Sequence, residues 1–173
     1  NGSYGKLRDL PATGGREGVG KVVEAGPEVD GAILGKLVSM PEHQGVWQSY
    51  AVAEVEDLIL LPSLVPVEQL AVAILNPVTA WRILHDFEYL REGDFIIQNA
   101  GNSAVGQAVV QFARMLGISC ISLVRSGQSL KELKNLGAEH VLLDDESVPK
   151  QVLDLTNGKK CVMALNSVGG KSA

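Results

Sequence analysis

The residues of this chain that most clearly suggest chemistry are glycines and small polar residues that directly follow an apolar run. Gly101 and Gly106 stand five residues apart, Asn102 and Ser103 lie between them, and a helical pattern begins at Ala104. A glycine turn between a strand and a helix lets the backbone approach a pyrophosphate, and the first N–H groups of the helix offer unpaired donors. The segment therefore predicts the first half of a dinucleotide-binding site.

A second polar turn, Arg125 to Gly127, follows the next apolar run, about 20 residues after the glycines. A site for NAD has Asp or Glu at this point, to accept a hydrogen bond from the ribose 2′-hydroxyl. A guanidinium and a hydroxyl suit a 2′-phosphate instead, so the sequence predicts NADPH. The glycine signal alone is weak, because Ser103 replaces the second glycine of G-x-G-x-x-G. A domain of the same class without a nucleotide is the alternative.

Alternating strands and helices are expected to position these residues. Apolar runs predict strands over residues 94–100, 119–124, 140–143 and 161–165, and amphipathic patterns predict helices over 104–116, 129–136 and 148–155. This alternation is typical of an α/β fold with a parallel sheet. Two further helices are expected over 67–75 and 76–84, with Asn76 as the cap of the second and Pro77 at its first position.

The first 62 residues or so lack helical periodicity. Short β-rich runs separated by turn residues predict strands over 20–24, 35–39, 47–52 and 58–61. Strands at this spacing predict a small antiparallel, barrel-like unit.

Composition and net charge argue against some classes of binding partner. The chain has 173 residues, a net charge of −5 and no cluster of Lys and Arg, which argues against nucleic acid or an anionic membrane as a partner. No apolar run approaches the roughly 18 residues that a membrane span requires. Cys120 and Cys161 fall in predicted strands, so buried free thiols are expected rather than a disulfide. Both ends of the chain read as the interior of a longer fold, and we expect a fragment.

Five segments together resemble one known family. They are residues 1–5, 10–20, 76–81, 99–107 and 165–170. The chain resembles the mitochondrial trans-2-enoyl-thioester reductases, a zinc-free branch of the medium-chain dehydrogenase/reductase superfamily. The resemblance implies a partial GroES-like β-barrel catalytic domain over residues 1–65 and the first half of a Rossmann doubly wound parallel sheet over residues 66–173.

The resemblance also implies an activity, the NADPH-dependent reduction of trans-2-enoyl thioesters of coenzyme A or acyl carrier protein in mitochondrial fatty acid synthesis. A hydride goes to the β-carbon and a proton to the α-carbon. A tyrosine suits the proton transfer, since its reference pKa of about 10 keeps it protonated at neutral pH. By its motif, Tyr4 is the expected proton donor, and Asn76 is expected to contact the cofactor and orient Tyr4. The remaining cofactor residues implied are Asn102, Ser103, Ala104 and Val105 for the phosphate loop, and Arg125, Ser126 and Gly127 for the 2′-phosphate.

Zinc-dependent members of the superfamily carry Gly-His-Glu where this chain has Gly15-Arg16-Glu17, and they have a cysteine cluster that is not present here. No metal site is therefore expected. The resemblance further implies a homodimer and a mitochondrial location. Two alternatives stay open, a zinc-free NADPH-dependent quinone or enone reductase, and a non-catalytic nucleotide-binding or interaction fragment.

Overall fold

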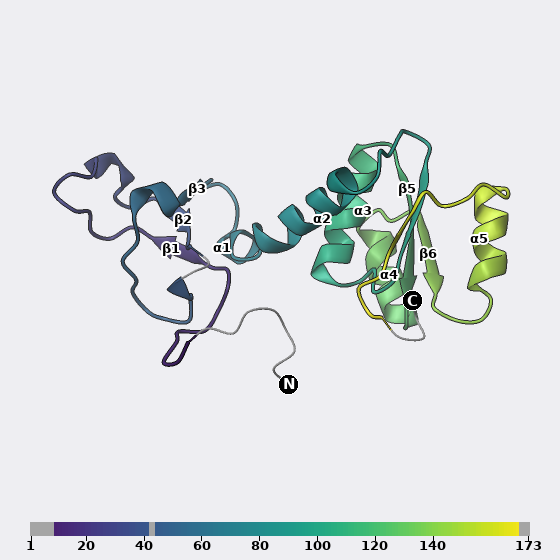
Figure 1. Cartoon of the computed structure of the whole chain (residues 1–173), viewed down its shortest axis with the longest axis horizontal. Helices are drawn as coiled ribbons and strands as arrows, with labels where there is room; N and C mark the ends of the chain where they lie inside the picture. Colours follow the sequence, from purple (N-terminus) through teal and green to yellow (C-terminus); the bar gives the residue numbers. More distant parts are fainter. Residues whose placement is uncertain (1–8, 42–43, 170–173) are drawn as a thin grey trace. The chain divides into compact units, whose positions relative to one another are not determined.

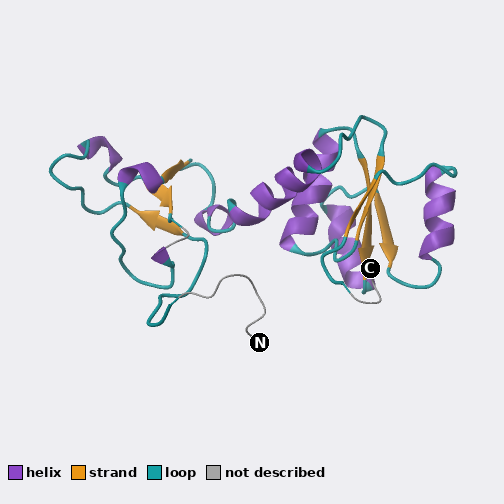
Figure 2. Ribbon diagram, viewed as in Figure 1, coloured by secondary structure: helices purple, strands orange, loops and turns teal. Residues whose placement is uncertain are grey.

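A computed structural model describes residues 9–41 and 44–169 (Figures 1 and 2). The chain divides into two compact units, Asn1–Leu75 and Asn76–Ala173. The predicted domain boundary between residues 65 and 66 lies before this division, and it stays a prediction. In the described part of the chain, no helix has the length and apolar character that a membrane span requires.

The first unit contains a three-stranded antiparallel sheet in the order β1-β2-β3. Its strands are β1 (Val19–Lys21), β2 (Leu37–Ser39) and β3 (Ile59–Leu61). Two short 3-10 helices, η1 (Gly31–Ile33) and η3 (Val55–Asp57), lie in the connections between the strands. This sheet agrees with the β-rich pattern of the first part of the chain.

The strand predicted over residues 47–52 is wrong. The N–H groups of Val46 and Trp47 both donate to the carbonyl of Gly14, at 2.8 and 3.0 Å, so the chain turns back here and joins no sheet. The Trp47 ring lies against Gly14 and Gly15, where an added Cβ would come within 2.7 Å of it. This largely exposed ring contacts the two glycines where strand pairing was expected.

Two helices follow β3, α1 (Val67–Leu70) and α2 (Leu75–Asp86). The predicted role of Asn76 as the cap of α2 is wrong, because α2 begins one residue earlier and Asn76 lies inside its first turn. The carboxylate of Glu17 accepts a hydrogen bond from the N–H of Leu75 at 3.0 Å. It places a negative charge at the positive end of the helix dipole.

The second unit contains a four-stranded parallel sheet in the order β6-β5-β4-β7. The strands are β4 (Phe95–Gln98), β5 (Ser119–Val124), β6 (His140–Leu143) and β7 (Met163–Leu165). The helices that connect them are α3 (Ala104–Met115), α4 (Gly127–Asn135) and α5 (Val148–Thr156). Figure 1 shows α3 and α4 on one side of the sheet and α5 on the other.

This order confirms the predicted first half of a doubly wound sheet. The chain moves from β4 outward to β6, and then crosses back to place β7 on the other side of β4. The carboxyl ends of β4 and β7 therefore form a topological switch point, the place where open α/β sheets bind their ligands.

Helix α3 contributes the most helical residues to the core of the second unit, which also includes residues of α2 and α4. Ala108, Val109 and Ala113 are buried on the inner face of α3, and they pack with Ile96 of β4. The predicted strand over 161–165 is shorter in the structure, since β7 begins at Met163. Cys161 therefore lies outside a strand and is only partly buried, contrary to expectation.

Candidate functional site

A tight turn joins β4 to α3, and close packing requires a glycine both in the turn, at Gly101, and in the first turn of α3, at Gly106. A Cβ at Gly106 would lie 2.6 Å from the carbonyl oxygen of Gly101, and a Cβ at Gly101 would lie 2.7 Å from the Cβ of Ser122. Ser103 caps α3, since its Oγ accepts a hydrogen bond from the N–H of Gly106 at 3.1 Å. The turn, residues 99–103, therefore lies directly against the first turn of the helix.

The N–H groups of Ala104 and Val105 lie in the first turn of α3. Such groups have no acceptor within their own helix, and the helix dipole adds a partial positive charge beside them. Ala104 is exposed and Val105 is partly exposed. The glycine turn thus offers backbone donors to an anion, as a pyrophosphate requires.

A second turn follows β5 and begins α4. Ser126 is the cap of α4, and its Oγ accepts a hydrogen bond from the N–H of Ser129 at 3.2 Å. Gly127 is the first residue of α4, and a Cβ there would meet no atom within 4 Å. Arg125 is exposed, and it forms no ion pair with any residue that the structure describes. Its guanidinium is available to a ligand.

Side-chain hydrogen bonds join the two turns. Asn102 Nδ2 donates to Ser129 Oγ at 3.2 Å, and Ser126 Oγ donates to the same oxygen at 3.0 Å. Because β4 and β5 are parallel neighbours, their carboxyl ends lie at one edge of the sheet. The structure therefore brings together at this edge Asn102, Ser103, Ala104, Val105, Arg125, Ser126 and Gly127.

Sequence reasoning missed Ser129 and Gln98. Ser129 stands three residues after the cap Ser126, a spacing that could have indicated a capping position. Gln98 is 3% exposed, and its Nε2 donates to the carbonyl of Gly106 at 3.0 Å and to Ser122 Oγ at 2.9 Å. The sequence feature that could have indicated Gln98 is a polar residue at the end of an otherwise apolar strand. Gln98 holds the first turn of α3 against β4 and β5.

The two remaining predicted residues are not joined to this edge by the hydrogen bonds above. Tyr4 lies outside the described residues, so its role stays a prediction. Asn76 is partly buried in the first turn of α2, an element separate from both turns. Its contact with a cofactor also stays a prediction. Among the described residues, no group of three His, Cys, Asp or Glu side chains could hold a metal ion.

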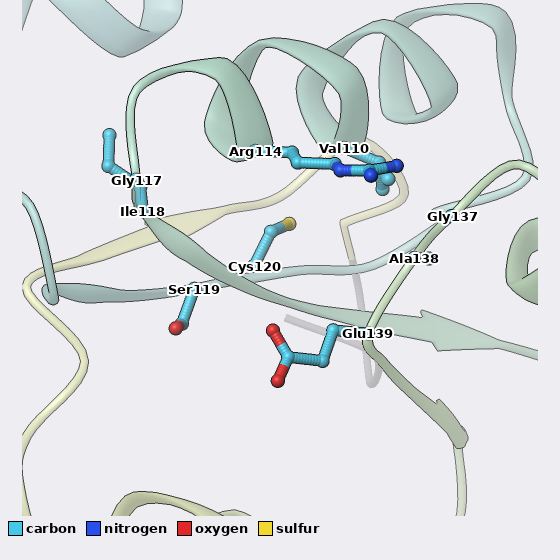
Figure 3. Close-up of a pocket in the computed structure, with 9 residues that line it drawn as sticks. All are labelled: Val110, Arg114, Gly117, Ile118, Ser119, Cys120, Gly137, Ala138 and Glu139. Carbon is cyan, nitrogen blue, oxygen red and sulfur yellow. The ribbon is translucent and has the colours of Figure 1, made fainter.

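A cavity of about 220 Å³ opens at the opposite, amino end of β5, where Arg114, Cys120 and Glu139 line it (Figure 3). Helix α3 ends beside this cavity, so the negative end of the helix dipole lies there. A negative dipole end disfavours a phosphate. The glycine-turn edge therefore remains the candidate site for a nucleotide.

Burial in the wall of this cavity raises the pKa of the Cys120 thiol to about 11. A contact with Ser122 Oγ at 3.7 Å lowers it only in part, and burial also raises the pKa of Cys161. At pH 8 only about 0.1% of a thiol of pKa 11 is thiolate, the form that reacts. We expect Cys120 to react with iodoacetamide much more slowly than the less buried Cys161, with a rate that rises up to about pH 11.

Mass spectrometry of labelled peptides, taken at intervals between pH 7 and pH 10, measures the two rates. Protein unfolded in guanidinium is the control, and there both cysteines should react at similar rates. Faster labelling of Cys120 than of Cys161 in the folded protein would contradict the expected protection.

This chain is similar in sequence and in structure to known proteins. A family model described as zinc-binding dehydrogenase matches residues 104–173. The chain is 45% identical over 177 residues to a protein of Xenopus tropicalis named mitochondrial enoyl-[acyl-carrier-protein] reductase. That match covers 99% of this chain and 51% of the relative, so the chain spans about half the length of the curated relatives it matches.

Two solved structures are also similar. A quinone oxidoreductase of Pseudomonas syringae is 31% identical with a TM-score of 0.80, and the match covers 94% of this chain and 51% of that one. A variant of Etr1p, the mitochondrial 2-enoyl thioester reductase of Candida tropicalis, was solved in complex with NADP and crotonyl-CoA. It is 30% identical with a TM-score of 0.82, and the match covers 93% of this chain and 50% of that one.

Proposed function

Since the chain belongs to the medium-chain dehydrogenase/reductase superfamily, we propose that the protein containing it reduces trans-2-enoyl thioesters with NADPH. One observation carries the proposal. A glycine turn and an arginine turn lie at one edge of a parallel sheet, in a chain that is 45% identical to an enoyl-[acyl-carrier-protein] reductase over 99% of its length. The thioesters are those of coenzyme A or acyl carrier protein.

The residues of this edge fit NADPH. The N–H groups of Ala104 and Val105 would hold the pyrophosphate, and Arg125 and Ser126 would hold the 2′-phosphate of the adenosine half. Gly127 leaves open space beside them, since a Cβ there would meet nothing within 4 Å. When bound, the cofactor supplies a hydride for the β-carbon of the substrate.

The chain itself supplies the proton. Tyr4 donates its phenolic proton to the α-carbon, where negative charge develops during the reduction. Asn76 contacts the cofactor and orients the Tyr4 hydroxyl. Both roles rest on the family motifs around residues 1–5 and 76–81.

The names of the relatives support the location, and the family resemblance supports the partners. We infer a mitochondrial protein that acts as a homodimer, with an enoyl thioester of coenzyme A or acyl carrier protein as its substrate. The similarity to a quinone oxidoreductase, with a TM-score of 0.80, supports a second candidate, a quinone or enone reductase. Turnover of crotonyl-CoA and of a quinone by the purified protein, each with NADPH, separates the two. Lack of turnover with crotonyl-CoA would overturn the first proposal.

The role of Arg125 provides a direct test of the cofactor assignment. Arg125→Ala should raise the KM for NADPH about 10- to 100-fold, because a hydrogen bond between charged groups contributes about 1.5–3 kcal/mol. The KM for NADH, which has no 2′-phosphate, should stay nearly unchanged. Steady-state kinetics with both cofactors measures the difference.

Lys131 offers a matched control. Like Arg125 it is an exposed cation, but it lies within α4, the helix that follows Arg125. Lys131→Ala should leave both KM values nearly unchanged. Equal losses for NADPH and NADH in Arg125→Ala would show that Arg125 does not recognise the 2′-phosphate.

A further inference from the structure

Asn99 joins the glycine turn to the loop that follows β7, residues 166–169. The Asn99 residue is 5% exposed, and its Nδ2 donates to Asn166 Oδ1 at 2.8 Å. Its own Oδ1 accepts from the N–H of Ser167 at 2.7 Å. Its backbone N–H donates to the carbonyl of Leu165 at 3.1 Å, which continues the pairing of β4 with β7. Both the backbone and the side chain of one residue thus hold this loop.

The side chain of Asn166 organises the rest of the loop. Besides Asn99 Nδ2, its Oδ1 accepts from the N–H of Val168 at 3.2 Å and from the N–H of Gly169 at 2.8 Å. Three donors therefore converge on one amide oxygen. The loop folds around Asn166, and the Asn99–Asn166 amide pair fastens it to the glycine turn.

The pair lies at the switch point of the sheet, where the order of the strands reverses between β4 and β7. On the edge described above, Arg125 follows β5 and the glycine turn follows β4. If the 2′-phosphate lies at β5 and the pyrophosphate at β4, the strand order β5-β4-β7 directs the other half of NADPH toward the loop after β7.

We propose that the Asn99–Asn166 pair is a positioning element that sets the distance between the glycine turn and the loop at residues 166–169. By setting this distance, the pair favours binding of the nicotinamide half of NADPH. It does not contact the reacting atoms. The inference rests on the proposed function. An apolar residue at position 99 could fill the same volume, but the N–H of Ser167 would then lose its partner and Asn166 Oδ1 would lose one of its three donors.

The test compares two ligands in the full-length protein, NADPH and adenosine 2′,5′-bisphosphate, which carries the 2′-phosphate but no nicotinamide. Asn99→Ala should weaken NADPH binding about tenfold, because the two partly buried side-chain hydrogen bonds described above are lost. Binding of the bisphosphate should change less than about twofold, because the residues at β5 remain in place. Fluorescence titration measures both dissociation constants, and steady-state kinetics should show the loss in the KM for NADPH.

Three further variants complete the test. Asn166→Ala removes the pair from the other side and replaces Asn99→Ala if that variant does not fold. Where both variants fold, the loss of NADPH affinity in the double variant should be smaller than the two single losses combined, since both single variants lack the same Asn99–Asn166 hydrogen bond. Asn135→Ala, an exposed residue at the end of α4, should bind both ligands like the wild type.

The outcomes separate this inference from the function on which it rests. Equal weakening of both ligands, or no weakening of either, would overturn the positioning role and leave the proposed function standing. A wild-type protein that fails to bind NADPH would overturn the proposed function, and this inference with it.

Discussion

Tyr4→Phe is expected to lower the kcat for NADPH-dependent reduction of crotonyl-CoA roughly 100-fold or more, the usual contribution of a positioned general acid. Phenylalanine keeps the ring and loses only the hydroxyl that would donate the proton. The variant should therefore bind NADPH like the wild type while turnover falls. Stopped assays of product, together with a fluorescence titration of NADPH, measure the two quantities separately.

Tyr89→Phe is a matched control for the same chemical change. Tyr89 is 78% exposed and lies before the amino end of β4, whereas the candidate site lies beyond the carboxyl end. Its loss of a hydroxyl should leave kcat within about twofold of the wild type, as expected for a substitution away from a functional feature. A Tyr4→Phe variant with unchanged kcat would remove Tyr4 from the mechanism.

Local patterns predicted the second unit well, because its helices carry their start and stop signals in the sequence. The helix α3 begins after its cap Ser103 and is followed by Gly117, which has a φ of 69°. Of its neighbouring strands, β5 is buried from Cys120 to Val124, and β4 is buried at alternate residues. Residues within a few positions of one another therefore carry enough information to define these elements.

The first unit was predicted less well, because interactions between distant residues override its local patterns. The β-rich composition of residues 47–52 is typical of a strand, yet the N–H groups of Val46 and Trp47 donate to the distant carbonyl of Gly14 instead. Similarly, the N–H of Leu75 finds its acceptor in Glu17, which is 58 residues away. Neither partner can be found from a window of neighbouring residues.

The same limit applies to the candidate site. The residues of the two turns follow from motif and spacing, and the structure places them at one edge of the sheet. Gln98 was missed, and no positioning role was assigned to Asn99, because their partners, Ser122 and Asn166, lie 24 and 67 residues further along the chain. A polar residue at the end of an apolar strand is the sequence feature that could have indicated them, because a buried polar group requires a hydrogen-bond partner.

Gly106→Ala is expected to destabilise the protein and to weaken NADPH binding. The added Cβ would lie 2.6 Å from the carbonyl oxygen of Gly101 and 2.8 Å from that of Ala100. Overpacking of this kind costs about 1–3 kcal/mol, and here the overlapping atoms belong to the backbone, which cannot rotate away. Alanine favours a helix over glycine by only about 1 kcal/mol, so the overlap outweighs the gain. Urea unfolding should show a lower free energy of unfolding, and fluorescence titration a Kd for NADPH at least about tenfold higher.

Gly127→Ala makes the same substitution in the first turn of another helix, where an added Cβ meets nothing within 4 Å. It serves as a control for stability only, because Gly127 is itself a proposed cofactor residue. Without overlap, the gain in helix preference should remain, and the free energy of unfolding should be equal to or slightly above that of the wild type. If both glycine variants changed stability alike, close contact between α3 and the glycine turn would not be the cause. If Gly106→Ala left the affinity for NADPH unaltered, the shape of the glycine turn would not determine pyrophosphate binding.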